Sequence, residues 1–236
     1  MEDYTDYFNY RNIDAEFYSD YELPKYLSKV LPRNKNAAIL DIGCGFGMTL
    51  SALIKEGYKS VRGIDISEKA VKFCNDKGLD VEKSNILDYC DAAKEDYDFI
   101  IMSHVLEHVE KSQIIITLKN IKMHLLNSEG NLCIMVPNAQ SNTGSYWAYE
   151  DFTHSTLFTT GSIIYVLKAA GFNLIKFLDP KGIENSAFTR RIFKEFFMSI
   201  YKFKKNFWNK ITSSSYHKPS PDIFTFDLKV LAGVKK

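Results

Sequence analysis

Short apolar runs alternate with stretches of helical periodicity along this chain from residue 37 to residue 178. The apolar runs have the length of strands, and the stretches between them repeat their apolar residues with a helical spacing. Parallel strands need helical crossovers of this kind, so the alternation predicts an α/β fold with a doubly wound sheet. We expect the strands at 37–43, 61–67, 81–86, 97–103, 131–137, 172–178 and 223–234.

The same alternation divides the chain into a core and three further segments. Residues 35–180 carry the strand and helix pattern, and residues 222–236 add a closing strand to the same sheet. Residues 1–34 precede the core as an aromatic extension, and residues 181–221 interrupt the pattern with a basic aromatic segment of near-helical spacing. Within the core, residues 138–158 form a polar, aromatic loop that is too long for a simple connection, and we expect it to be functional.

The composition is that of a globular protein, with 45% hydrophobic residues, 25% charged residues and a net charge of +1. Such a charge gives no overall attraction to nucleic acid or membrane, and we expect no nucleic-acid partner. The four cysteines form no C-x-x-C pair, which suits a reducing compartment. The acidic start is unlike a secretory signal and no apolar run has transmembrane length, so we expect a cytoplasmic protein.

The first expected strand runs into DIGCGFG, a glycine-rich turn at residues 41–47. Such a turn needs glycine for positive φ and for close approach of a ligand. The dinucleotide fingerprint G-x-G-x-x-G would place its third glycine at Met48, which counts against NAD. Asp41 would repel a pyrophosphate there but could hold an ammonium group, and Asp65, 22 residues after Gly43, suits ribose hydroxyls. A ligand with a ribose, a cationic amine and no phosphate is implied, and S-adenosylmethionine fits that description.

The motifs ILDIGCGFG, GIDIS, SNILD and YDFIIMSHVLEHV together resemble the class I S-adenosylmethionine-dependent methyltransferase family. The resemblance covers roughly residues 35–178 and the closing strand 223–234. It implies a Rossmann-like, seven-stranded sheet with an antiparallel last strand and helices on both faces, an N-terminal helical lid, and a helical insertion before the last strand. It also implies S-adenosylmethionine as methyl donor, with S-adenosylhomocysteine as its product.

The resemblance assigns a cofactor site residue by residue. The glycine turn would face the methionine moiety, Asp65 would bind the ribose, and Ile66 would stack on the adenine. Asn85, with Ile86 beside it, would lie near the adenine amino group, and Ser103 would offer its backbone to the methionine amine. Asp65 could instead cap a strand end, and Asn85 could be an ordinary turn residue. The expected cofactor-binding residues are Asp41, Gly43, Cys44, Gly45, Gly47, Asp65, Ile66, Asn85, Ile86 and Ser103.

The segment HVLEH, residues 104–108, fits the H-x-x-E-H pattern of zinc peptidases. A zinc site would need both histidines on one helix and a third ligand downstream. The preceding strand runs straight into His104, and no other cluster in the sequence supplies an obvious third ligand, so we expect no metal. In the family this segment lies over the cofactor. We therefore expect HVLEH to form an active-site wall, in which His108 either acts on the acceptor or locks the loop through a hydrogen bond.

Aromatic and ionisable residues gather in the loop and the residues that follow it, NAQSNTGSYWAYEDFTHSTLFTT (138–160). Methyl transfer to a hydroxyl group requires removal of its proton, for which histidine is the natural base. His154 is the first candidate and His108 the second, and Asp151 could orient His154 or bind the acceptor directly. His154 could equally be a structural anchor of the loop. The aromatic residues of the loop are Tyr146, Trp147, Tyr149 and Phe152.

The stretch DFTHSTLFT, with the following helix that ends in AAGF, resembles methyltransferases found with bacterial surface-glycan synthesis. This resemblance implies O-methylation of a sugar, a nucleotide-sugar or a related small precursor of a capsule or lipopolysaccharide polysaccharide. The alternative acceptors are a phosphorylated or nucleotide-linked small molecule, RNA and protein. A non-enzymatic cofactor-binding partner subunit is a further alternative.

The two flanking segments carry opposite charge. Residues 1–22 hold seven acidic residues and one basic residue, and this extension could close over the cofactor as a lid or simply pack on the sheet. Residues 190–210 hold seven basic residues and one glutamate, interleaved with aromatic residues. Core or dimer packing, peripheral contact with an anionic membrane, and RNA binding are the alternatives for the basic segment. We expect a monomer or a homodimer.

Overall fold

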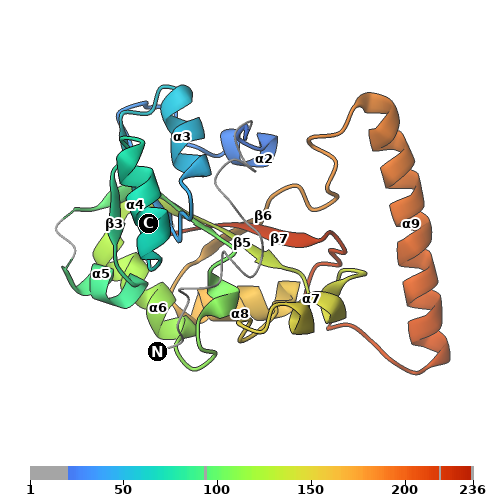
Figure 1. The fold of residues 1–236 in the computed structure, drawn as a ribbon. Coiled ribbons are helices and arrows are strands. Elements are labelled where there is room, and N and C mark those ends of the chain that lie inside the picture. The colour runs from blue at the N-terminus through green and yellow to red at the C-terminus, as the bar shows by residue number, and fades with distance from the viewer. Residues whose placement is uncertain (1–20, 93–94, 218, 235–236) are drawn as a thin grey trace.

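The computed structural model describes residues 21–92, 95–217 and 219–234. Its strands are β1 (Ala38–Ile42), β2 (Ser60–Asp65), β3 (Val81–Lys83), β4 (Tyr97–Ser103), β5 (Leu126–Pro137), β6 (Leu174–Phe177) and β7 (Asp227–Gly233). They form one seven-stranded sheet in the order β3-β2-β1-β4-β5-β7-β6, shown in Figure 1. β7 is antiparallel to β5 and β6, and the other pairs are parallel. The predicted doubly wound sheet with an antiparallel last strand is confirmed.

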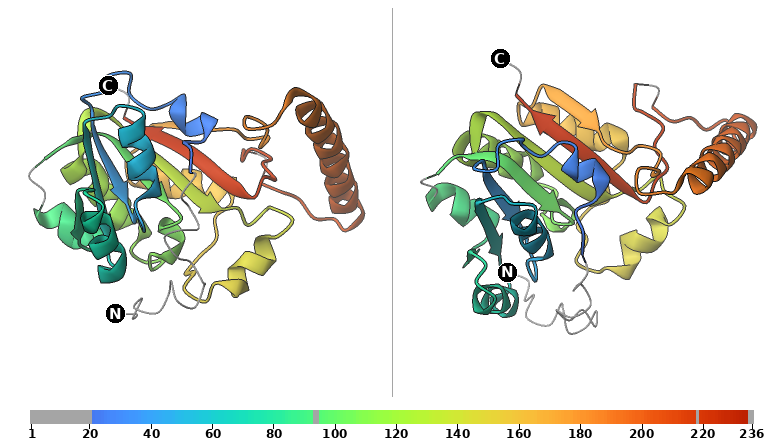
Figure 2. Two further views of the ribbon diagram at one scale, coloured as in Figure 1. Left: turned by 45° about the horizontal axis from the view of Figure 1, so that its top comes forward. Right: turned by 90° about the horizontal axis from the view of Figure 1, so that it is seen from above.

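Helices cover both faces of the sheet, as Figure 2 shows. The α-helices of the described residues are α2 (Lys25–Ser28), α3 (Met48–Lys55), α4 (Glu68–Asp76), α5 (Ile86–Ala92), α6 (Ile114–Asn120), α7 (Gly144–Glu150), α8 (Thr160–Ala169) and α9 (Phe188–Ile211), of which α9 lies apart from the sheet. Successive side chains of a strand point to opposite faces. Leu40 and Ile42 of β1 therefore enter the apolar cluster shared with α5, α6 and α8, and Ile39 enters the cluster shared with α2 and α3.

Strand β5 begins at Leu126 rather than at residue 131, where the sequence places it. Helix α6 continues into a π-helical turn that ends at Leu125, and both leucines are buried. Leu126 pairs with Tyr97 of β4, so the chain turns directly from the helix into the sheet. Gly130 consequently lies inside the strand.

Two other boundaries differ from the sequence prediction. The region predicted to be an irregular loop, residues 138–158, contains helix α7. Strand β7 begins at Asp227, although the predicted strand begins at residue 223. The reason for the late start is Asn138, whose side-chain amide donates to the carbonyl oxygens of Ile223 and Thr225, each at 2.9 Å. These carbonyl groups are held by a side chain instead of by a neighbouring strand.

Helix α9 confirms the predicted helical insertion before the last strand. Figures 1 and 2 show this helix beside the α/β core and separated from it along most of its length. None of its residues is buried. In the part of the chain that the structure describes, no helix is both long enough and apolar enough to cross a membrane.

The predicted N-terminal helical lid over residues 1–34 is described only from Tyr21 onward. In that part, the short helix α2 buries Tyr26 and Leu27 against the same sheet face as α3. The remainder of the predicted lid, residues 1–20, lies outside the described residues.

Candidate active site

The carboxyl ends of β1, β2, β3 and β4 meet at one edge of the sheet and enclose a cavity of about 300 Å³. Ligands of doubly wound sheets bind at this edge because all parallel strands end there. Each strand end contributes to the wall, with Gly43 after β1, Asp65 at the end of β2, Asn85 after β3 and His104 after β4. The volume lies at the lower end of the range for small-molecule sites.

The turn after β1 has the backbone conformation that glycine adopts most easily, with φ of 68° at Gly43 and 53° at Gly45. A Cβ atom on Gly43 would lie 2.3 Å from Cγ2 of Val105, so no side chain fits there. A Cβ atom on Gly45 would meet nothing within 4 Å. Gly43 therefore permits close approach of the segments after β1 and β4, whereas Gly45 leaves open space at the cavity.

Two other residues of the turn, both predicted to bind the cofactor, do not line the cavity. A Cβ atom on Gly47 would lie 2.5 Å from Cδ1 of Leu79 and 2.9 Å from Sγ of Cys74. Cys44 belongs to the apolar cluster that contains Cys74 and Leu50. In this structure, Gly47 and Cys44 pack helices α3 and α4 beneath the turn.

Backbone groups hold the carboxylate of Asp65 at the end of β2. Its Oδ2 accepts the N–H of Gly45 and its Oδ1 accepts the N–H of Ser67, both at 2.8 Å. Burial raises the pKa of Asp65, and the backbone hydrogen bonds oppose this rise. Each carboxylate oxygen has a second lone pair. Asp65 can therefore tie the glycine turn to β2 and still accept a hydrogen bond from a ligand hydroxyl.

Asp41 lies deeper than Asp65, inside β1 and only 3% exposed. It is not among the residues that line the cavity. Burial, together with the negative charge of Asp65, raises the pKa of Asp41 to about 8. The charge of Asp41 in turn adds to the effect of burial in raising the pKa of Tyr21. Two acidic groups thus lie close together beneath the turn, where a cation would be favourable.

The predicted adenine-side residues Ile66, Asn85 and Ile86 all line the cavity, whereas Ser103 ends β4 without lining it. Ile66 is 45% exposed, so an apolar surface faces the ligand space. The Oδ1 atom of Asn85 accepts two backbone N–H groups from the first turn of α5, each at 3.0 Å. Asn85 is therefore a turn residue and a cavity residue at the same time.

Strand β4 continues into His104, whose φ of 54° is unusual for a residue other than glycine. The chain then forms a 3₁₀ turn over Leu106–His108. The two histidines of HVLEH therefore do not share an α-helix. Nδ1 of His104 lies 3.3 Å from Oε1 of Glu107. Burial disfavours charge on His104, but the contact with Glu107 raises its pKa overall.

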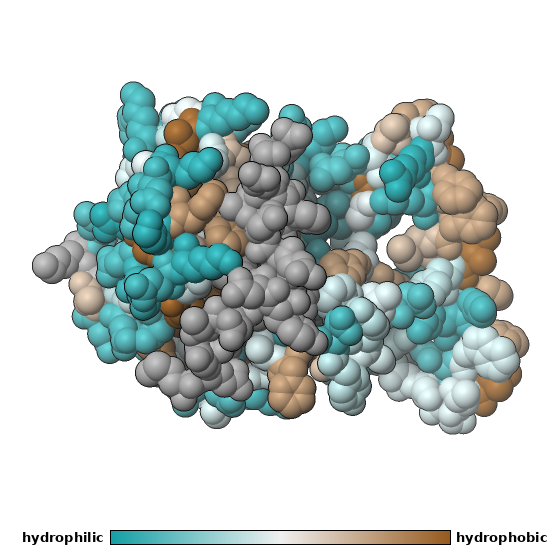
Figure 3. Space-filling model, in the orientation of Figure 1, coloured by the Kyte–Doolittle hydropathy of each residue, from teal (hydrophilic) through white to brown (hydrophobic). Residues whose placement is uncertain are grey.

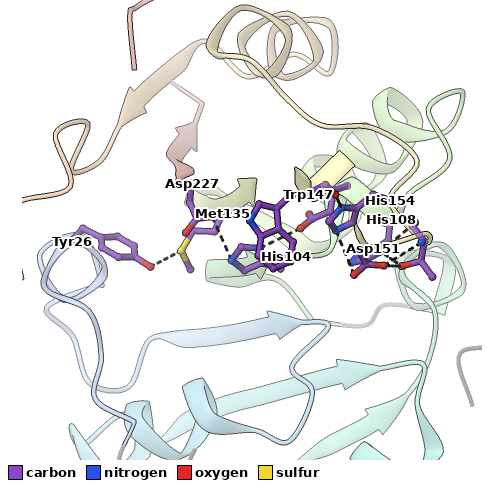
Figure 4. A network of polar contacts seen from close by, with 10 residues as sticks. Tyr26, His104, His108, Met135, Trp147, Asp151, His154 and Asp227 are labelled. Atoms are coloured by element: carbon purple, nitrogen blue, oxygen red, sulfur yellow. Dashed lines mark hydrogen bonds and ion pairs between the residues drawn. The ribbon is translucent and has the colours of Figure 1, made fainter. Parts of the chain in front are cut away.

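The loop after α7 brings a second polar segment to His108, and Figure 4 shows the resulting group of side chains. The ring centroids of His108 and His154 are 4.8 Å apart. Nδ1 of His154 lies 2.8 Å from the carbonyl oxygen of Trp147, and Nδ1 of His108 lies 2.9 Å from Oγ1 of Thr153. The Thr153 hydroxyl donates to Oδ1 of Asp151 at 2.6 Å, and Oδ2 of Asp151 lies 3.7 Å from Nε2 of His154.

Burial and hydrogen bonding set the protonation of this group. Burial lowers the pKa of His108, although the charge of Glu107 opposes the change. For Asp151, burial favours protonation, but the hydrogen bonds from Thr153 make its pKa lower than usual overall. His108 lines the cavity, whereas the side chain of His154 is 5% exposed and does not line it. The site therefore presents a neutral imidazole to the cavity and supports it with an ionised carboxylate.

Sequence reasoning missed the parts played by Val105, Glu107 and Thr153. Their contacts depend on a crossing of two distant segments, at which the backbone N–H of Ser155 donates to the carbonyl oxygen of Glu107 at 2.8 Å. No periodicity in the sequence signals this crossing. Thr153 had a local signal because it lies between Asp151 and His154, and Glu107 had one as the acid of the H-x-x-E-H pattern.

Comparison with known proteins agrees with this geometry. Residues 15–176 match the family model described as a methyltransferase domain, and the chain belongs to this family. It is 32% identical over 121 residues to the ubiquinone biosynthesis O-methyltransferase of Xylella fastidiosa. The matched segment covers 48% of this chain and 46% of the relative. It is 28% identical over 183 residues to the sphingolipid C9-methyltransferase of Komagataella phaffii, covering 66% of this chain and 36% of the relative. The chain thus matches less than half the length of either curated relative.

The fold is also that of a solved S-adenosylmethionine-dependent methyltransferase from Archaeoglobus fulgidus, with a TM-score of 0.65 and 23% identity over 98% of this chain and 99% of that one. S-adenosylmethionine is the methyl donor of the domain. The cavity fits this molecule, because the space at Gly45 is open and the acidic pair lies beneath the turn. Among the described residues that line the cavity there is no lysine or arginine, which suits a cofactor without phosphate.

The raised pKa of Asp41 predicts a specific pH dependence of stability without cofactor. Because its folded pKa of about 8 lies above the ordinary 3.8, folding takes up a proton between these values. This contribution to stability is present at low pH and is lost as the pH rises toward 8, with a slope of at most about 1.4 kcal/mol per unit. In urea unfolding, the stability of Asp41→Asn relative to that of the wild type should therefore increase from pH 5 to pH 8. The exposed control Asp91→Asn should not, and a constant difference for Asp41→Asn would contradict this assignment.

Proposed function

We propose that this domain transfers a methyl group to a hydroxyl oxygen of a small acceptor, and that a sugar, a nucleotide-sugar or a related precursor of a bacterial surface polysaccharide is that acceptor. The observation that carries the proposal is His108 at the cavity wall, with Thr153 and Asp151 behind it. A neutral amine attacks through its own lone pair and would have less use for an imidazole base in that position. The curated relative named as an O-methyltransferase supports oxygen as the methylated atom.

In this proposal the strand ends hold the methyl donor. Asp65 accepts the ribose hydroxyls, Ile66 packs on the adenine, and Asn85 with Ile86 forms the rest of the adenine wall. The open backbone at Gly45 receives the methionine moiety. All five of these residues line the cavity, which supports these roles. Asp41 would act on the ammonium group from below through water, and Ser103 would contribute only backbone.

The bound donor supplies a methyl group on a positively charged sulfur. The protein's part is to orient the acceptor oxygen in line with that methyl group and to remove the hydroxyl proton. His108 is the better placed of the two histidines, because it lines the cavity and its lowered pKa leaves it neutral near pH 7. His154, the first candidate from the sequence, packs against His108 from behind, and Asp151 acts on His108 through the Thr153 hydroxyl.

Exposed aromatic rings of α7 and the loop after it support a sugar as acceptor. Tyr146, Tyr149 and Phe152 are all more than half exposed, and Phe152 is 99% exposed. Trp147 packs edge-on against Phe226, with ring centroids 5.6 Å apart. Such rings offer apolar faces on which a sugar ring can lie. The absence of lysine and arginine from the described cavity wall is unfavourable for RNA as acceptor. The diphosphate of a nucleotide-sugar would accordingly lie outside this wall.

Replacement of Asp65 by asparagine should weaken cofactor binding by roughly 10- to 100-fold, the usual range for a hydrogen bond to a charged group. The amide would also place an N–H group against one of the two backbone donors that Asp65 now accepts. Titration calorimetry with S-adenosylhomocysteine measures the change. Asp91→Asn, exposed on the far end of α5, should bind like the wild type. If the wild type, Asp65→Asn and Asp91→Asn bind S-adenosylhomocysteine with equal affinity, the assignment of Asp65 to the cofactor site is contradicted.

Incubation with S-adenosylmethionine and a panel of nucleotide-sugars should give a product with one added methyl group, detected by mass spectrometry. His108→Asn should lower kcat by roughly 10²- to 10⁴-fold, the usual contribution of a general base, with little change in affinity for S-adenosylhomocysteine. His124→Asn, an exposed histidine elsewhere, is the matched control. Methylation of RNA or protein alone, with no small molecule modified, would contradict the proposed acceptor.

We further propose that α9 places the enzyme on an anionic membrane surface, where lipid-linked glycan precursors would be accessible. The polar side of this helix contacts the segments that connect it to the core, through a hydrogen bond from Lys194 to the carbonyl of Gly182 at 2.8 Å and an ion pair between Lys202 and Asp222 at 3.0 Å. Its apolar side chains remain exposed, and Figure 3 shows them along the outer edge of the molecule. They are Phe188, Ile192, Phe193, Phe196, Phe197, Ile200, Phe203, Phe207, Trp208 and Ile211.

Charge complementarity favours a membrane over a second copy of the chain as the partner of this face. Residues 190–210 carry seven basic residues and one acidic residue, and two such helices would repel each other. Lysine and arginine next to anionic lipid contribute about 1 kcal/mol each. The four free cysteines, all buried, support a reducing, cytoplasmic location for such a peripheral protein.

Vesicles that contain phosphatidylserine should bind the full chain, and neutral phosphatidylcholine vesicles should bind it less in a sedimentation assay. The double variant Phe196→Glu and Phe203→Glu should lose binding by at least about tenfold, because two exposed rings no longer enter the lipid. Tyr165→Glu, which changes an exposed ring on α8, should bind like the wild type. A dimer in gel filtration that the double variant dissociates, without any vesicle binding, would instead assign this face to a second copy.

A further inference from the structure

Three side chains of metal-ligand type meet beside the cofactor cavity. Glu107, His108 and His154 bring their ligand atoms within 4.8 Å of one another. The sequence shows no third ligand near HVLEH, but the fold supplies His154 from the loop after α7. In place of the metal-free site expected from the sequence, we propose that these three side chains bind one divalent cation at the wall of the cavity.

The strongest indication is the carboxylate of Glu107, which is completely buried. Its Oε1 faces Nδ1 of His104 at 3.3 Å. Its Oε2 has no hydrogen-bond partner among the residues that the structure describes. A buried carboxylate oxygen without a partner is unfavourable, and a cation at that position would compensate it. Glu107 therefore has an unused ligand atom inside the cluster.

Both imidazole rings have the orientation that metal-binding histidines commonly show. Nδ1 of His154 can only donate to the carbonyl oxygen of Trp147. The Thr153 hydroxyl gives its proton to Asp151, so its oxygen accepts the proton on Nδ1 of His108. In both rings the lone pair therefore resides on Nε2. Metal-ligating histidines typically donate their other ring N–H to a carbonyl, carboxylate or hydroxyl group in this way.

A second carboxylate adds negative charge at the same place. Oδ2 of Asp151 lies 3.7 Å from Nε2 of His154, and the backbone of Thr153 donates to Oδ1 of Asp151 at 3.1 Å. Two carboxylates beside two imidazole rings favour a cation with two positive charges. Two nitrogen ligands and one oxygen ligand favour Zn²⁺, Co²⁺, Fe²⁺ or Mn²⁺ over Ca²⁺, which takes oxygen ligands.

Three protein ligands leave a coordination position open, as in catalytic metal sites. The role of that position rests on the proposed function. The acceptor hydroxyl would bind there and lose its proton to water, because a bound cation lowers the pKa of the oxygen. The oxygen then uses a lone pair to form the new O–CH₃ bond while the S–CH₃ bond breaks, and that electron pair stays on sulfur. With Nε2 of His108 on the cation, the cation takes over the task assigned above to a neutral imidazole.

Cation binding can be measured directly, without turnover. The full chain, with no histidine tag and after dialysis against EDTA, is titrated with Co²⁺ in visible absorption and with Zn²⁺ and Mn²⁺ in calorimetry. We expect one cation per chain, with absorption bands of Co²⁺ bound to nitrogen and oxygen. His154→Asn keeps a donor for the Trp147 carbonyl but removes Nε2, and Glu107→Gln keeps the shape of the side chain. Both variants should lose the bound cation.

The control is the double variant His124→Asn and His217→Asn, which removes two exposed histidines outside the cluster and should bind like the wild type. Asp151→Asn should weaken binding by roughly 10- to 100-fold, as expected for a residue that positions a ligand. S-adenosylhomocysteine binding by each variant verifies that it is folded.

Absence of stoichiometric binding to the wild type, or undiminished binding to both His154→Asn and Glu107→Gln, would overturn the proposal. The proposed methyltransferase function fails separately. If the wild type binds one cation but neither S-adenosylhomocysteine nor any acceptor, the cation site stands and the proposed function does not. If methyl transfer is unchanged in EDTA and no cation binds, the proposed function stands with His108 as its base and the cation site is excluded.

Discussion

The hydrogen bond from the backbone of Gly45 to the carboxylate of Asp65 is the contact on which the site depends. It joins the turn after β1 to the end of β2, so the two strand ends form one wall of the cavity. The same carboxylate, buried and negatively charged, contributes to the raised pKa of Asp41 below it. A positively charged ligand above the turn would relieve this repulsion. A positively charged ligand group is therefore favourable where the sheet places these two acids.

The opposite wall is built in a different way. The segment after β4 leaves the sheet at His104 through a left-handed residue, and the loop after α7 crosses it. Backbone contact between Ser155 and Glu107 holds the crossing, and the His108–Thr153–Asp151 hydrogen bonds are formed on top of it. This wall brings two histidines, His104 and His108, to the cavity, whereas Ile66 and Ile86 supply apolar surface at the ends of β2 and β3. In the proposed function, the chemistry of the acceptor, whether assisted by an imidazole or by a cation, takes place on this side of the cavity.

Much of the fold could be predicted because buried strands and helices require apolar residues at regular spacings in the sequence. The alternation of Ile39, Leu40 and Ile42 between two apolar clusters requires a strand covered on both faces, and the glycines of DIGCGFG require a tight turn at its end. Boundaries were less predictable. Glycine at position 130 favours the end of a helix. It lies within β5 instead, because Leu125 and Leu126, which precede it, are buried in the core and the strand begins at Leu126.

The sequence by itself determined the class of sheet, the glycine turn, and the acids at residues 41 and 65, because each is a local requirement of backbone geometry or burial. Tertiary structure decided which side chains meet. It turned Gly47 and Cys44 away from the cavity, since helix α4 packs against them, and it put His108 rather than His154 at the wall. It also joined Glu107 to His154, which lie far apart along the chain. Such a group forms only when two loops cross, and no spacing of residues records a crossing.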